Sequence, residues 1–211
     1  MLKNIKHSIE RVVLRCGPNG SQVPLGFTPA SVNVFVGPNH SGTTARIIAP
    51  LRRLGVAAAA IVDIDLLLEA KSQGFQNLIE AAGIPPATRQ SLGQLRGQLH
   101  AIVKPKDKSL KKQGTACVTG NERLDLNNLI DQMAQYGVFV VPVGELECWL
   151  PNLPRSQWSD KTEWLLQTFE AMGEEADASD YLQPSTGDVW DFMSRVCGWL
   201  QNPHRLGMPE I

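Results

Sequence analysis

Short apolar runs alternate with helix-like patterns along the first two thirds of the chain. Residues 32–36 and 57–62 have the composition of buried strands, and between them apolar residues recur at helical spacing from Thr44 to a stop at Gly55. A third strand-like run covers 138–143. Because strand, helix and strand in this order favour a parallel crossover, the sequence predicts an α/β fold, a short parallel sheet with flanking helices.

Further patterns complete the predicted architecture. Residues 9–14 are typical of a strand, which gives a small N-terminal β extension. Helices are predicted over 75–82, 87–103, 126–133, 160–172 and 187–200. In the helix after Thr44, Arg46, Arg52 and Arg53 are expected on the polar side. The predicted parts are an N-terminal β segment (1–42), an α/β domain (43–154) and an acidic C-terminal helical tail (155–211).

Two acidic pairs follow two of the predicted strands. Asp63 and Asp65 come after 57–62, and Glu145 and Glu147 come after 138–143. In an extended segment the side chains of residues i and i+2 share a face, so each pair can converge on a hard cation such as Mg²⁺. A pair of aspartates at a strand exit can equally cap a following helix.

The position of these pairs favours the metal interpretation. Strand ends of a parallel sheet meet at one edge, where two acidic pairs would repel each other unless a cation or a basic partner lies between them. The predicted metal ligands are Asp63, Asp65, Glu145 and Glu147. A Mg²⁺ ion held there could position water for phosphodiester hydrolysis, with Asp63, Asp65 and Glu145 as catalytic residues.

Residues 37–44 join a predicted strand to a predicted helix. Their sequence, GPNHSGTT, matches the phosphate-loop pattern GxxxxGK[ST] at every position except the lysine, which is Thr43. An ordinary turn has the same composition, so both interpretations stay open. Without the lysine that neutralises the phosphates, ATP would bind weakly or not at all. The nucleotide-binding interpretation uses Gly37, Asn39, Ser41, Gly42, Thr43 and Thr44.

The net charge of −1 hides a separation of charge along the chain. Residues 1–144 carry 16 Lys and Arg against 9 Asp and Glu, whereas residues 145–211 carry 4 against 12. The most basic element is the segment 104–112, KPKDKSLKK. It can be a solvated linker, or it can contact the phosphate backbone of DNA by releasing counterions. Its candidate contact residues are Lys104, Lys106, Lys108, Lys111 and Lys112.

Composition excludes several classes of protein. The longest apolar stretch, 56–62, is far shorter than the roughly 18 residues of a membrane span, so we expect no membrane partner and a cytoplasmic protein. The first residues lack the apolar block of a signal peptide. The 4 cysteines are scattered and form no C-x-x-C pair, which argues against a disulfide framework or a zinc ribbon.

Two stretches resemble parts of one protein family. Residues 9–42, ending in GPNHSG, are similar to the amino-terminal strands and phosphate loop of the OLD-family (overcoming lysogenization defect) ATPases, which are related to ABC- and AAA-type ATPases. Residues 44–151, with AAAAIVDIDLL and VFVVPVGELECWLP, resemble the topoisomerase-primase (TOPRIM) domain of that family. The resemblance implies that Asp63 and Asp65 form the Mg²⁺-binding D-x-D of an endonuclease, and that Glu145 and Glu147 match its recurring acidic segment.

The chain also departs from that family pattern. An intact OLD-type chain has several hundred residues between its phosphate loop and its metal domain, and here the two are adjacent. The glutamate on the first strand of the metal domain is missing as well, because Gly37 and Pro38 follow that strand. The resemblance therefore implies a remnant that is joined near 41–44 and has lost ATP hydrolysis.

Three functions remain open at this point. The first is a TOPRIM-like, Mg²⁺-binding, DNA-associated module, which would be a Mg²⁺-dependent endonuclease if it is active. The second is a non-catalytic assembly module that pairs with another copy of the chain or with an intact homologue. The third is a degenerate phosphate-loop protein that binds a nucleotide.

Overall fold

The computed structural model describes the backbone of residues 12–15, 24–27, 33–36, 41–69, 73–144 and 189–209, and side chains within these ranges from Thr44 onward. Strands β1 (Val12–Arg15) and β2 (Pro24–Phe27) pair in antiparallel fashion. Strand β1 overlaps the strand predicted over 9–14, whereas its partner β2 lies where no strand is predicted. The predicted tail helix 160–172 lies outside the described residues.

A parallel three-stranded sheet forms the centre of the fold. Its strands are β3 (Asn33–Val36), β4 (Ala58–Val62) and β5 (Val138–Val140), in the order β3-β4-β5. Val34 lies opposite Ala59 in the register, and Ile61 lies opposite Phe139. The crossover from β3 through α1 to β4 has the predicted parallel strands, so the α/β class is confirmed. The sheet takes its first strand from the segment 1–42, across the boundary that the sequence predicts.

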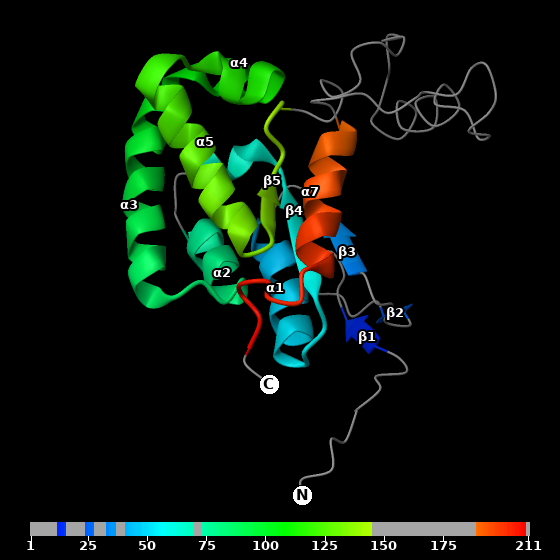
Figure 1. Ribbon diagram of the computed structural model, residues 1–211. Helices are drawn as coiled ribbons and strands as arrows, with labels where there is room; N and C mark the ends of the chain where they lie inside the picture. The colour runs from blue at the N-terminus through cyan, green and yellow to red at the C-terminus, as the bar shows by residue number, and fades with distance from the viewer. Residues whose placement is uncertain are drawn as a thin grey trace, which may run out of the picture.

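Helices surround this sheet (Figure 1). The α-helices are α1 (Ser41–Arg53), α2 (Gln73–Ala81), α3 (Pro86–Val103), α4 (Asp107–Gln113), α5 (Gly120–Gln135) and α7 (Val189–Gln201). Short 3₁₀ helices are η2 (Ile64–Leu67), η3 (Lys104–Lys106) and η4 (Gly114–Cys117). None of the helices in the described part of the chain is long and apolar enough to span a bilayer.

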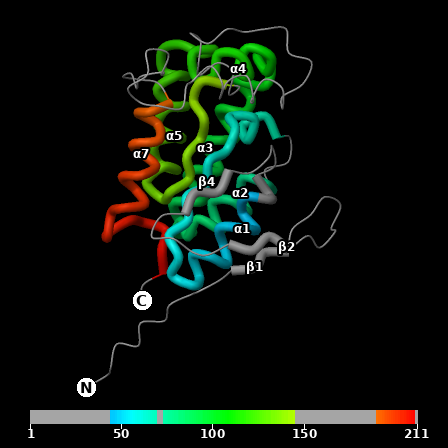
Figure 2. The backbone as a smooth tube through the Cα atoms, turned by 90° about the vertical axis from the view of Figure 1, so that its right-hand side faces the viewer, coloured from blue at the N-terminus to red at the C-terminus, as the bar shows by residue number. Residues whose placement is uncertain are grey.

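Side chains of β4 alternate between two separate cores. Ala58, Ala60 and Val62 face a core that is shared with α1, α2, α3 and α5. Ala59 and Ile61 face the other core, which α7 covers. Because successive strand residues point to opposite faces, a run that is buried on both sides must be apolar throughout, as the sequence predicts. Figure 2 shows α7 running along one side of the molecule.

Three elements differ from their predictions. Helix α1 begins at Ser41, before the predicted start at Thr44, so the glycine-rich segment contributes its first turn. Strand β5 ends at Val140, where a run to 143 is predicted, because the chain turns at Pro142–Gly144. The segment 104–112 is not a linker: it forms η3 and most of α4.

Candidate functional site at the carboxyl edge of the sheet

The two aspartates after β4 lie at the carboxyl edge of the sheet. Asp63 caps η2 with extended backbone (φ −68°, ψ 151°), and Asp65 lies inside that 3₁₀ helix. Both residues are half-buried. The extended segment that the sequence predicts therefore stops at Asp63, and the i, i+2 geometry of a strand does not apply to the pair. Asp63 occupies the N-cap position of η2, and its side chain makes no cap hydrogen bond there.

Helix α3 holds η2 in place through two side chains. The Nη2 atom of Arg96 donates to the backbone oxygens of Leu66 and Glu69. The Nδ1 atom of His100 lies 2.7 Å from the backbone oxygen of Leu67. Burial lowers the pKa of the Arg96 guanidinium, and the nearby carboxylate of Glu69 partly offsets this. Two side chains of α3 therefore hold η2, which carries Asp65, and the sequence alone does not single them out.

The lysine segment is an ordered helix with one apolar anchor. Leu110 is fully buried and fixes α4 to the core. The Asp107 carboxylate accepts a hydrogen bond of 2.6 Å from the backbone amide of Lys108, at the first turn, where a negative charge is favourable. The five lysines, all exposed, are Lys104, Lys106, Lys108, Lys111 and Lys112. Burying Leu110 is what turns a charged segment into a helix with a fixed orientation.

Two glycines pack α4 against the loop after β5. Gly114 has φ 56°, and a Cβ atom there would lie 1.8 Å from the backbone oxygen of Pro142. Gly144 has φ 95°, and a Cβ atom there would lie 2.2 Å from the backbone oxygen of Lys111. The backbone amide of Thr115 donates a 2.8 Å hydrogen bond to the oxygen of Pro142. This backbone contact places α4 beyond the carboxyl ends of β4 and β5 (Figure 1).

One lysine of α4 pairs with the predicted metal ligand Asp65. The Nζ atom of Lys111 lies 3.1 Å from Oδ2 of Asp65, and the two side chains are 45% and 35% exposed. Carboxylates that lie close together at this edge repel each other unless a cation or a basic side chain lies between them. For Asp65 that basic side chain is Lys111. Lys106 makes a looser pair with Glu122 at 3.6 Å. Partial exposure keeps both pairs weak.

The remaining predicted site residues are not brought together in the described part of the chain. Glu145, Glu147, Gly37 and Asn39 lie outside it. Ser41, Gly42 and Thr43 form the first turn of α1, with side chains outside the described set, and Thr44 is buried with 2% of its surface exposed. Among the residues that the structure describes, no group of three or more His, Cys, Asp or Glu side chains could hold a metal ion.

The prediction that Arg52 lies on the polar side of α1 is wrong. Arg52 is only 2% exposed. Its Nε, Nη1 and Nη2 atoms donate to backbone oxygens at the ends of other elements, and its guanidinium stacks 4.9 Å from the ring centroid of Trp199. The acceptors are Ala58, Ala82, Tyr136, Gly137 and Gly207. Arg52 is therefore a buried structural charge, while Arg46 and Arg53 are exposed as predicted.

The residues that sequence reasoning missed are Arg96, His100 and the buried Arg52. Arg96 and His100 are four residues apart in a predicted helix, which places them on one face. The sequence holds no signal that this face contacts the loop after β4. A comparison of the chain with protein-family models, with curated proteins and with solved structures found no match.

Proposed function

We propose that the chain is a TOPRIM-like, DNA-associated module that binds the phosphate backbone through η3 and α4. The observation that supports the proposal most strongly is the position of the lysine segment. It is a helix at the carboxyl edge of a parallel α/β sheet, the edge at which such sheets bind their ligands, and one of its lysines contacts Asp65. A disordered linker would supply the same charge without that placement.

The chemistry of the segment suits sequence-independent binding. Clustered ammonium groups release counterions from DNA, and each phosphate contact adds affinity that falls with salt. The segment 104–112 contains no aromatic side chain, so base stacking is not part of the proposed contact. Because helix α4 is already formed, little ordering entropy has to be offset when DNA binds.

The experiment measures the affinity of a short fluorescein-labelled duplex by anisotropy at low salt. The lysine variant replaces three exposed lysines by alanine, namely Lys104, Lys108 and Lys112. The matched arginine variant replaces three exposed arginines by alanine, namely Arg46, Arg53 and Arg123. We expect the lysine variant to bind at least about tenfold more weakly than the wild type, and the arginine variant to bind nearly as well. Equal loss in both variants would show that the lysine segment is not the preferred DNA contact and would contradict the proposal.

We further propose that Mg²⁺ binds at Asp63 and Asp65 when DNA is present. The contact that favours this second step is the ion pair between Lys111 and Asp65. A phosphate that draws the ammonium group away from Asp65 leaves a carboxylate that needs a new cation, and a divalent ion bound to oxygen ligands suits that position. Metal binding and DNA binding should therefore strengthen each other.

Thermal unfolding with and without duplex tests the metal step. Millimolar Mg²⁺ should raise the Tm more in the presence of DNA, by the linkage between ligand concentration and Kd. Replacing both Asp63 and Asp65 by alanine should abolish the rise, whereas Asp125→Ala, at an exposed site on α5, should leave it intact. If the double variant keeps the Mg²⁺-dependent rise in Tm, Asp63 and Asp65 are not the metal site. If the wild type also fails to bind the duplex, the assembly module is the alternative that remains, and sedimentation of the chain can test it.

A further inference from the structure

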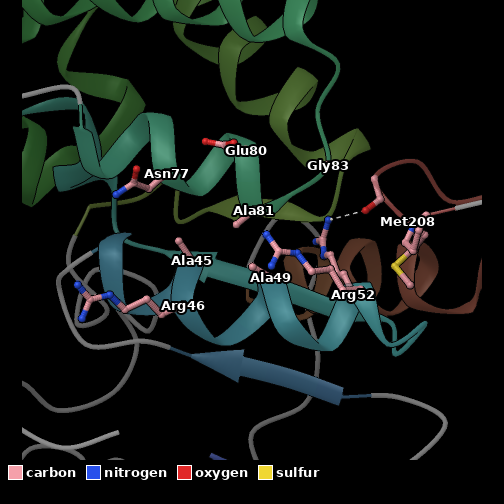
Figure 3. Close-up of a pocket in the computed structure, with 12 residues that line it drawn as sticks. Ala45, Arg46, Ala49, Arg52, Asn77, Glu80, Ala81, Gly83 and Met208 are labelled. Carbon is pink, nitrogen blue, oxygen red and sulfur yellow. Dashed lines mark hydrogen bonds between the residues drawn. The ribbon is translucent and has the colours of Figure 1, made fainter. Parts of the chain in front are cut away.

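A pocket of about 490 Å³ is lined by residues of α1, α2 and the C-terminal segment. Figure 3 shows α1 on one side of it and α2 on the other, with Met208 of the C-terminal segment at one end. Ala45, Ala49 and Ala81 line its floor. Figures 1 and 2 both place the carboxyl end of α1 far from α4, so this pocket is separate from the proposed DNA contact.

The wall of the pocket contains a buried positive charge. Arg52 lines it, and its hydrogen bonds run to backbone oxygens. Burial lowers the pKa of Arg52 to about 10, so the guanidinium is still charged at neutral pH. No carboxylate in the described part of the chain pairs with it. Carbonyl dipoles satisfy its N–H groups but carry no net charge, so the pocket keeps a positive potential.

Two exposed arginines add to this potential. Arg46 and Arg53 line the pocket from α1 and are seven residues apart, which places them two helical turns or about 10 Å apart along the axis. Neither has an ion-pair partner among the residues that the structure describes. Among the residues that the structure describes, Glu80 is the only carboxylate that lines the pocket. Its Oε1 atom lies 3.6 Å from Nη1 of Arg89. Three arginines therefore line a cavity whose one carboxylate among the described residues is already engaged, and in Figure 3 the side chain of Arg46 extends away from that of Arg52.

The size and the lining of the pocket narrow the class of ligand. A cavity of about 490 Å³ is within the range of roughly 300–1,000 Å³ that small-molecule sites occupy. The guanidinium fork matches phosphate oxygens bidentately. The alanine floor and Met208 offer an apolar surface to an organic group. Asn77 supplies an amide nitrogen that can donate a hydrogen bond, while its oxygen already accepts one from Nε2 of Gln73.

We propose that this pocket binds a small organic phosphate, with its phosphates at Arg46 and Arg53 and its organic part on the alanine floor between α1 and α2. The site is independent of the DNA contact at α4. It also differs from the glycine-rich loop, because its arginines come from the second and fourth turns of α1.

Isothermal titration of the full chain with ADP and with inorganic pyrophosphate, in EDTA so that no metal takes part, tests this site. Arg46→Gln and Arg53→Gln should each weaken ADP binding about tenfold, because each removes a hydrogen bond to a charged group. Arg123→Gln removes the same charge on α5 and should change nothing. Ala49→Phe fills the pocket without changing charge and should also abolish binding, whereas Ala101→Phe, exposed on α3, should not.

Several results would overturn the proposal. One is the absence of heat with either ligand at millimolar concentration. Another is ADP binding that persists when both Arg46 and Arg53 are replaced, which would place the nucleotide at the glycine-rich loop. Citrate that binds more tightly than ADP would exclude a phosphate site. If the Arg46 and Arg53 variants weaken duplex DNA but not ADP, the pocket belongs to a DNA surface. DNA binding by the lysine variant tests only the contact at α4, and ADP binding by the arginine variants tests only the pocket. The two proposals can therefore be contradicted independently.

Discussion

The two ends of the sheet use positive charge in opposite ways. At the amino ends of β4 and β5, the Arg52 guanidinium is buried and donates to five backbone oxygens. At the carboxyl ends, the Lys111 ammonium is 45% exposed and pairs with the half-buried carboxylate of Asp65. If Arg52 moved, its buried backbone acceptors would lose their hydrogen-bond donors. Lys111 can exchange Asp65 for another anionic partner.

This difference separates a structural charge from an available one. Arg52 connects α1 to residues that follow α2 and α5 and to the C-terminal segment, where helix ends present partial negative charge. Near Lys111, the backbone at Gly114 and Gly144 packs closely on the loop after β5, and its ammonium group pairs with Asp65. The position of α4 at the carboxyl edge is therefore fixed, while its lysine ammonium groups can change partners. That combination is the one a ligand site needs.

The largest effect should come from Arg52. Arg52→Met should lower the free energy of unfolding by about 3 kcal/mol or more, because buried carbonyl groups lose their donors. Arg53→Met is the matched control on the next, exposed residue and should change it by less than about 0.5 kcal/mol. Chemical denaturation measures both. Similar values for the two variants would contradict the contrast between the two ends.

The next effect separates backbone geometry from contact at the carboxyl edge. Gly114→Ala should cost about 2 kcal/mol or more, since positive φ and a clash with Pro142 act together. Gly120 has the same φ of 56° with open space around it, so Gly120→Ala should show the smaller cost of backbone strain alone. Equal costs in urea denaturation would show that α4 does not pack tightly on the loop after β5.

The smallest effect on stability should come from the ion pair itself. Lys111→Met should change the free energy of unfolding by less than about 1 kcal/mol, because half-exposed pairs contribute little. The substitution keeps much of the apolar stem of the side chain. Thermal unfolding of Lys111→Met beside Gly114→Ala makes the comparison. A loss in Lys111→Met as large as that in Gly114→Ala would mean that the pair holds α4 in place.

Local patterns predict the sheet of this protein well and its charged residues less well. Residues 57–62 identify β4 because a strand buried on both faces must be apolar at every position. Helical periodicity places Arg52 on the polar side of α1. In the folded chain, however, backbone oxygens from turns that are distant in sequence lie next to its guanidinium and bind it. The segment 104–112 shows the same limit. Its charge suggests a linker, and the one buried residue that makes it a helix, Leu110, is decisive only because of its tertiary contacts.

The candidate site shows where prediction from sequence stops. Asp63 and Asp65 are correctly expected at the end of a strand, since that depends on neighbouring residues alone. Lys111 pairs with Asp65, whereas Arg96 and His100 contact the backbone of Leu66, Leu67 and Glu69. All three side chains come from 27 to 46 residues later in the chain than the groups that they contact. Which helix face reaches the strand end depends on how α3 and α4 pack, and no local pattern encodes that.

The salt dependence of DNA binding tests the central claim most directly. The slope of log K against log salt should fall in magnitude by about 2 to 3 in the lysine variant, since each phosphate contact contributes about 0.9. The arginine variant, which removes the same charge elsewhere, should keep the slope of the wild type. An unchanged slope in the lysine variant, or an equal change in both variants, would show that α4 is not the DNA contact.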